Sequence, residues 1–162
     1  MAKKLNLKSW WLLLLIAGIG GLASCKKESL QQSGLNKEQL VAGRLDGTWT
    51  TPTNIITPEN VPAEIFGTMR LVFTTDGAGS PSKFMAQDCP IVFGNAGNAG
   101  TWKVTGTQDS AKVNVTDYGP VDEFKVRVTS STLTISFYMG WENTDTKATG
   151  KGTFQVTLTR QQ

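Results

Sequence analysis

A two-residue alternation of apolar and polar side chains runs through most of the chain after Gly47. Short alternating runs, separated by Gly, Asp, Ser and Pro, are typical of antiparallel strands with one buried and one solvated face. The sequence predicts eight such strands, at residues 48–51, 67–75, 89–93, 101–105, 112–116, 123–129, 132–139 and 153–160. In the sixth, Phe124 and Val126 point to one face while Lys125 and Arg127 point to the other.

These one-sided strands restrict the fold, because a single open sheet would leave its apolar face in water and its edges unpaired. Eight strands in up-and-down order close into a barrel whose interior holds its own side chains or one small ligand. We therefore expect an all-β fold, an eight-stranded antiparallel up-and-down barrel. A β-sandwich of two stacked sheets is the alternative, since periodicity alone does not separate the two architectures.

One short helix is expected before the first strand. Asn36 suits its N-cap, and Gln39 occupies the capping-box position three residues later. Leu40 and Val41 offer a small apolar face, and Gly43 is expected to end the helix.

The N-terminus has the layout of an export signal. Lys3, Lys4 and Lys8 precede an apolar run over residues 10–19, with no acid among the first eight residues. A transmembrane helix needs about 20 apolar residues, so this run is too short to span a bilayer. We expect residues 1–24 to be a signal peptide.

The end of that segment, Leu22-Ala23-Ser24-Cys25, resembles the bacterial lipobox. The resemblance implies cleavage before Cys25 and acylation of Cys25 with fatty chains such as palmitate, which together hold a protein firmly on a membrane. An ordinary cleavage site with an incidental cysteine is the alternative. The residue after Cys25 is Lys26 rather than Asp, so the expected location of this lipoprotein is the outer membrane of a Gram-negative cell envelope.

The chain then divides into a flexible tether over residues 25–35 and one domain over residues 36–162. Its 16 basic and 13 acidic residues become 13 and 13 once the three signal lysines are removed. A neutral mature chain gives no electrostatic reason to bind nucleic acid. With Cys25 acylated, Cys89 has no cysteine left to pair with, so no intramolecular disulfide is expected.

Two features resemble the lipocalins and related calycin barrels. Gly47-Thr48-Trp49 opens the first predicted strand as the Gly-x-Trp signature of that family does, and residues 52–66 resemble its long loop across the barrel mouth. Thr116-Asp117-Tyr118 is similar to a second family motif. Arg160 is similar to the arginine that packs over the first-strand tryptophan, a cation-π contact.

The chain departs from that family in two ways. Arg160 follows the Thr-Asp-Tyr triplet by 44 residues, and no long helix comes after the last strand. The resemblance, over residues 43–162, is therefore to a divergent lipocalin-like lipoprotein of the kind found in Bacteroidota. It implies a barrel fold, with Gly47, Trp49 and Arg160 in structural roles.

Catalytic chemistry finds little support. The chain has no histidine, which removes Ser-His-Asp and Cys-His catalysis and the commonest zinc ligand. Cys89 is interpreted as a small buried residue. The carboxylate pairs Asp122/Glu123 and Glu142/Asp145 are interpreted as solvated turns. We expect no enzyme activity, no metal and no cofactor.

Two polar loops also lack the features of a binding site. Residues 142–145 do not have the spaced acids and glycine of a calcium loop. Residues 94–100, rich in glycine, are not followed by a helix that would hold a phosphate. The second loop is interpreted as a mobile hairpin connection.

The interior offers the remaining candidate site. The inward aromatic residues either pack as core or line an apolar pocket, and six are the candidate ligand-binding residues: Phe73, Phe93, Trp102, Phe124, Phe137 and Phe154. Trp141 is interpreted as an exposed aromatic in a polar loop, at a rim or partner surface.

Two functional hypotheses follow. The first is a membrane-tethered, non-enzymatic barrel that binds a small apolar or amphipathic ligand. The second is an envelope protein-interaction or structural module with a solid core, whose function lies on loops 52–66 and 140–152 and which has a protein partner in the envelope.

Overall fold

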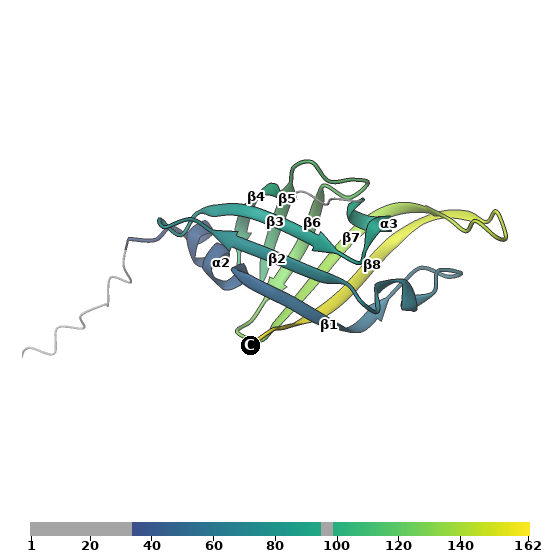
Figure 1. Ribbon diagram of the computed structural model, residues 1–162, viewed down its shortest axis with the longest axis horizontal. Helices are drawn as coiled ribbons and strands as arrows, with labels where there is room; N and C mark the ends of the chain where they lie inside the picture. The colour runs from purple at the N-terminus through teal and green to yellow at the C-terminus, as the bar shows by residue number, and fades with distance from the viewer. Residues whose placement is uncertain (1–33, 95–98) are drawn as a thin grey trace, which may run out of the picture. The chain divides into compact units, whose positions relative to one another are not determined.

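A computed structural model of the protein describes residues 34–94 and 99–162. The strands, each antiparallel to its neighbours, form a closed barrel in the order of the sequence, and the last strand pairs with the first (Figure 1). The strands are β1 (Gly47–Ile56), β2 (Arg70–Thr75), β3 (Pro81–Gln87), β4 (Gly100–Thr107), β5 (Ser110–Val115), β6 (Glu123–Val128), β7 (Thr132–Glu142) and β8 (Thr149–Arg160). The predicted up-and-down barrel is confirmed, and the sandwich alternative is wrong.

The signal peptide, Cys25 and most of the tether fall in residues 1–33 and lie outside the described residues. Leu35–Gln162 form one compact unit. Within the described residues, the helices are all too short or too polar to traverse a lipid bilayer.

Strand alternation produces the core directly. On β5 and β6 every second residue is buried and every other one is exposed. The buried face of β6 carries Phe124, Val126 and Val128, as the sequence predicts. Because both edges of the sheet are used in closure, no apolar face of these strands is left in water.

The prediction of a strand at residues 89–93 is wrong. Pro90–Phe93 form a short helix, α3, and the third strand is β3, which the sequence analysis did not identify. Pro90 occupies the first helical turn, where its fixed φ and missing N–H favour a helix start. The β3 pattern is weak because only Phe84 and Ala86 are fully buried on it.

Helix α2 (Lys37–Leu45) precedes β1 and has the predicted capping box. The Asn36 side chain accepts from the Gln39 N–H, and the Gln39 side chain accepts from the Asn36 N–H. The helix passes through Gly43 and ends at Leu45, so the predicted end is wrong. Extension to Leu45 buries that residue against the barrel, and this burial outweighs the roughly 1 kcal/mol by which glycine disfavours a helix.

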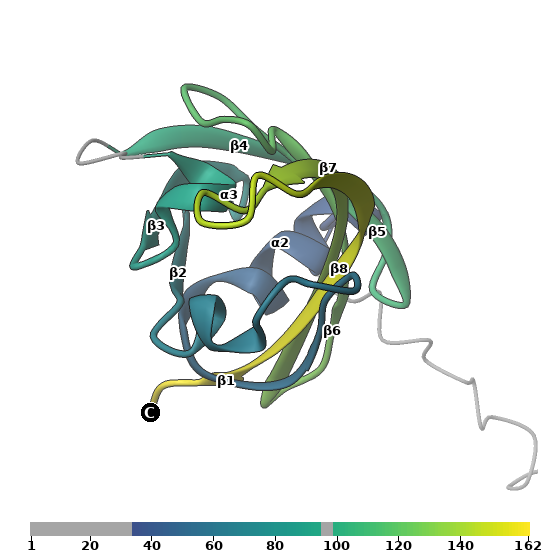
Figure 2. The same ribbon diagram turned by 90° about the vertical axis from the view of Figure 1, so that its right-hand side faces the viewer.

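Helix α2 closes one end of the barrel, as Figure 2 shows by looking through from the other end. Trp49 is completely buried there, and its indole N–H donates to the Leu45 carbonyl over 2.7 Å. The Arg160 guanidinium carbon lies 4.4 Å from the centroid of the Trp49 ring. Arg160 also donates to the carbonyls of Asp46, Arg44 and Ser130. One side chain thus joins the end of α2, the β6–β7 turn and the first-strand tryptophan.

Gly47 is required by the same contact. Its φ of +126° is one that side chains with a Cβ rarely adopt, and a Cβ there would lie 2.8 Å from an Arg160 guanidinium nitrogen. Both specified positions of the Gly-x-Trp pattern therefore contact Arg160: Gly47 leaves room for its guanidinium group, and Trp49 packs against it.

Arg160→Ala should lower the free energy of unfolding by about 3 kcal/mol, because charge-assisted hydrogen bonds and a cation-π contact disappear together. Urea denaturation followed by tryptophan fluorescence measures the change. Arg127→Ala is the control, because Arg127 is exposed on β6 and should shift stability by no more than about 0.5 kcal/mol. Equal effects of the two substitutions would contradict this role of Arg160.

Candidate functional site

The end of the barrel opposite α2 is surrounded by three segments. They are residues 57–66 with the short 3-10 helix η1 (Ala63–Phe66), helix α3, and the hairpin end of β7 and β8 (Figures 1 and 2). The predicted loops over 52–66 and 140–152 are shorter than expected. β1 continues to Ile56, while β7 reaches Glu142 and β8 begins at Thr149, so the hairpin forms an arm beside the mouth.

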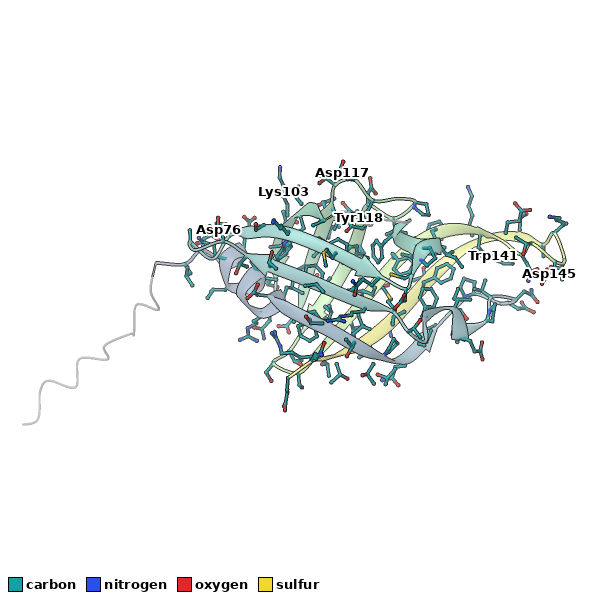
Figure 3. All side chains as sticks on the ribbon, viewed as in Figure 1. Asp76, Lys103, Asp117, Tyr118, Trp141 and Asp145 are labelled. Atoms are coloured by element: carbon teal, nitrogen blue, oxygen red, sulfur yellow. The ribbon has the colours of Figure 1, made fainter. Side chains whose placement is uncertain are left out.

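A pocket of about 440 Å³ lies between these three segments. Its apolar lining consists of Val61, Pro62, Ile65, Ile91, Met139, Trp141 and Phe154. Its polar lining consists of Asn60, Glu142, Asn143, Thr144 and Asp145, and Figure 3 shows Trp141 and Asp145 on the arm, at the opposite end from Asp76. An apolar pocket of this size with a few polar groups has the usual composition of a small-molecule site.

Three aromatic rings form the floor of the pocket. Phe154 lines it and stacks on Phe137, with ring centroids 5.4 Å apart and planes 5° apart. The Phe66 ring meets both edge-on, at centroid distances of 6.3 Å and 5.9 Å. All three side chains are buried. These three rings therefore form one packed group, and Phe154 is the ring of the group that lines the pocket.

Below this floor, aromatic side chains pack against one another. Each ring contacts at least one other, with centroids between 4.9 Å and 6.2 Å apart. The rings are Phe73, Phe84, Phe93, Trp102, Tyr118 and Phe124. Two polar ends also find partners, because the Trp102 indole donates to Thr74 and the Tyr118 hydroxyl donates to the Phe84 carbonyl.

The six candidate ligand-binding residues therefore fall into two groups. Phe154 lines the pocket and Phe137 lies directly under it. Phe73, Phe93, Trp102 and Phe124 belong to the deeper cluster and do not line this pocket. A ligand contact for any of the six stays a prediction. Val61 and Ile65 were not predicted because they lie outside the alternating strands, and Ile91 was not predicted because residues 89–93 were expected to form a strand instead of helix α3.

Trp141 is not the exposed loop residue that the sequence predicts, although it does line the pocket at the barrel mouth. It lies within β7 and is half-buried, and its indole packs on Gly150, its partner on β8. A Cβ on Gly150 would lie 2.6 Å from the indole ring. Gly152 makes the same kind of room for Pro58, at 2.4 Å. Gly150 and Gly152 share the inward-facing side of β8 with Phe154, and we call these two glycines the glycine cradle. The two-residue spacing of Gly150, Gly152 and Phe154 was the sequence signal that β8 begins earlier than predicted.

Two carboxylates, Glu142 and Asp145, are the charged side chains that line the pocket, and no cation does. Glu142 ends β7 and has the Lys147 ammonium 4.0 Å away, on the exposed tip of the arm. The Asp145 N–H donates to the Asn143 side chain, as in a turn. The pocket therefore has an acidic rim above an apolar interior.

The second carboxylate pair lies on the outer wall. Glu123 begins β6, accepts from the Lys112 ammonium at 2.8 Å, and also accepts from Asn114. The hydrogen bond from Lys112, followed by that from Asn114, lowers the pKa of Glu123. This residue is an exposed cross-strand ion-pair partner and not a part of the pocket.

Cys89 is buried beside Pro90, as predicted. Desolvation, followed by repulsion from Asp88, raises the pKa of its thiol to about 12, so the thiol is protonated near neutral pH. Over the described ranges, no three His, Cys, Asp or Glu side chains gather as a metal site would need. Residues 95–98 of the glycine-rich loop lie outside the described residues.

Comparison of the chain with protein-family models, curated proteins and solved structures finds no match. The closed eight-stranded antiparallel barrel is compatible with a lipocalin-like fold. The contact of Arg160 with Trp49 and the capping of the Trp49 end by α2 agree with the structural roles that the resemblance implies.

Gly150→Ala should displace the Trp141 ring, because the new methyl group would occupy the space of the indole. Acrylamide quenching of tryptophan fluorescence should increase. Gly140→Ala is the matched control on the neighbouring strand, since its Cβ would meet no atom nearer than 3.7 Å. The same quenching in both variants would show that Gly150 does not seat the ring.

Proposed function

We propose that this protein is a membrane-tethered, non-enzymatic, lipocalin-like barrel that binds a small apolar or amphipathic molecule. The observation that carries the proposal is the pocket of about 440 Å³ at the barrel mouth, with an apolar lining above an aromatic floor. Pockets of about 300–1,000 Å³ with such linings hold small molecules in many proteins.

The floor limits which ligands fit. Phe154 lines the pocket and packs on Phe66 and Phe137, and further aromatic rings pack together deeper in the barrel. A compact molecule, held at the mouth with one polar end among the rim residues, suits this shape. The carboxylates Glu142 and Asp145 disfavour an anionic head group and favour a neutral or cationic one.

The absence of enzyme activity is part of the proposal. The chain contains no histidine, and the buried Cys89 thiol stays protonated at neutral pH because its pKa is raised to about 12. The exposed Glu123 is occupied with Lys112 and Asn114. These facts leave no recognised nucleophile–base pair within the described residues.

The membrane tether rests on the sequence. Residues 1–24 as signal peptide and Cys25 as the acylated residue would place the mature protein on a membrane, and we propose the outer membrane of a Gram-negative envelope. Mass spectrometry of the mature N-terminal peptide tests this part of the proposal, because acyl chains on Cys25 add a characteristic mass.

Ile91→Glu should weaken binding of the neutral fluorescent probe N-phenyl-1-naphthylamine at least tenfold, since it places a carboxylate in the apolar lining. Probe fluorescence titration measures the affinity. Ile56→Glu is the matched control: Ile56 is 56% exposed and Ile91 is 53% exposed, but Ile56 does not line the pocket. Absence of probe binding to the unsubstituted protein, or equal weakening by both substitutions, would refute the pocket.

A second candidate function is an envelope protein-interaction or structural module. The deeper interior, filled by six mutually packed rings, favours it, because a solid barrel serves well as a scaffold. Tyr138, at 66% exposure on the outer face of β7, is the most exposed of the large hydrophobic residues described. Such a surface aromatic suits a protein contact.

If this second function holds, a photo-crosslinker in place of Tyr138 should capture one protein partner in stoichiometric yield in cells. The same crosslinker in place of Lys125, on the charged wall of β6, is the control. Identical products from both positions, or no product from position 138, would count against a specific partner.

A further inference from the structure

Helix α2 has an outer face that no described part of the protein covers. Val41, Ala42 and Leu45 are buried on its inner face, against the barrel. Leu40 is 41% exposed, and Leu35 just before the helix is 42% exposed. Two large apolar side chains are therefore partly exposed within six residues at the closed end of the barrel, and Leu35 lies close to Gly79 in the β2–β3 turn.

Two cations flank Leu40 on the helix. Lys37 lies three residues before it and Arg44 four residues after it, and these spacings place all three on adjoining positions of one helical surface. Both cations are exposed, and neither forms an ion pair with any residue in 34–94 or 99–162. A leucine between unpaired basic residues is the side-chain pattern of helices that lie at a lipid–water interface.

A third cation adds to this end of the barrel. Arg127 and Arg44 line one groove, formed by the end of α2, the β4–β5 turn and the β6–β7 turn. Asp109 also lines this groove, and Glu38 lies near the start of α2.

Two further carboxylates at the closed end serve the fold instead. The Asp46 side chain accepts from the Thr75 N–H, and the Asp76 side chain accepts from the N–H groups of Ala78 and Ser80. The outer face of α2 itself presents Lys37 and Arg44 beside Leu40, so its charge complements an anionic surface.

We propose that the outer face of α2 rests on an anionic lipid surface. Leu35 and Leu40 would lie at the boundary between the head groups and the acyl chains, and Lys37 and Arg44 would lie beside the phosphates. The length of the chain before the barrel favours this occupant over a protein. Cys25, the predicted acylated residue, is ten residues before Leu35, and ten extended residues span at most about 35 Å. The closed end is where the chain enters the barrel.

The proposal rests on the tether in the proposed function and is independent of the pocket. Its consequence is an orientation: the mouth, at the opposite end from α2, opens away from the bilayer (Figure 1). The ligand would then enter from the aqueous side, and the membrane would not deliver it directly into the pocket.

The test uses the mature protein purified from the envelope and reconstituted with vesicles of phosphatidylcholine, with or without an equal amount of phosphatidylglycerol. An environment-sensitive fluorophore is attached in Gly43→Cys, on the exposed side of α2, or in Thr144→Cys, at the tip of the arm. With phosphatidylglycerol present, quenching by doxyl-labelled lipid should be at least threefold stronger at position 43 than at position 144.

Charge reversal supplies the matched pair of variants. Lys37→Glu with Arg44→Glu should abolish the quenching at position 43, whereas Lys147→Glu with Lys151→Glu, the same charge change on the arm, should preserve it. Circular dichroism checks that each variant is folded. Equal quenching at both positions, stronger quenching at 144, or no effect of the α2 reversal would overturn the proposal.

The other proposals fail in distinguishable ways. An unacylated Cys25, seen by mass spectrometry, refutes the tether, and α2 must then still bind phosphatidylglycerol vesicles for this inference to stand. Absence of N-phenyl-1-naphthylamine binding to the unsubstituted protein refutes the pocket without changing the quenching at position 43.

Discussion

Closure of the sheet between β8 and β1 is the constraint on which the other features depend, because it removes both edges and encloses every inward-facing side chain. Arg160 and Trp49 are register partners at this seam, and they are also in ring–cation contact. The guanidinium spans from the seam to the carbonyl end of α2, where its positive charge suits the helix dipole. Closure of the barrel and capping of its end are therefore stabilised by the same side chain.

The side chains inside the barrel differ between its two ends, the end closed by α2 and the open mouth. Six aromatic rings pack together in the lower part, and Phe154, which packs on Phe66 and Phe137, lines the pocket at the mouth. The other walls come from the 57–66 segment and α3, which lie outside the strand ladder, and from the arm, where β7 and β8 stay paired beyond the rest of the barrel. This pocket is thus built by segments at the mouth of the barrel.

The sequence predicted the elements in which burial alternates strongly, such as β6 with Phe124, Val126 and Val128, because a period of two reports one buried face. It failed at residues 89–93, where β-branched Ile91 and Val92 suggest a strand but Pro90 starts a helix. Whether such a short apolar segment forms a strand depends on hydrogen bonds to a neighbouring strand far away in the sequence, and these cannot be read from the segment itself. Of the pocket walls, the resemblance placed only residues 52–66 at the barrel mouth, and α3 and the arm were missed because periodicity does not report which segment approaches the mouth.

The glycine cradle on β8 keeps the lining of the pocket apart from the residues that hold the barrel closed. Gly150 and Gly152 leave the inner side of this end of β8 without side chains, and Trp141 from β7 and Pro58 from the segment after β1 fill that space. None of these four residues takes part in the ring cluster or the Arg160 seam. Substitutions at the mouth can therefore change the lining of the pocket without altering the packed rings or the Arg160 contacts below it.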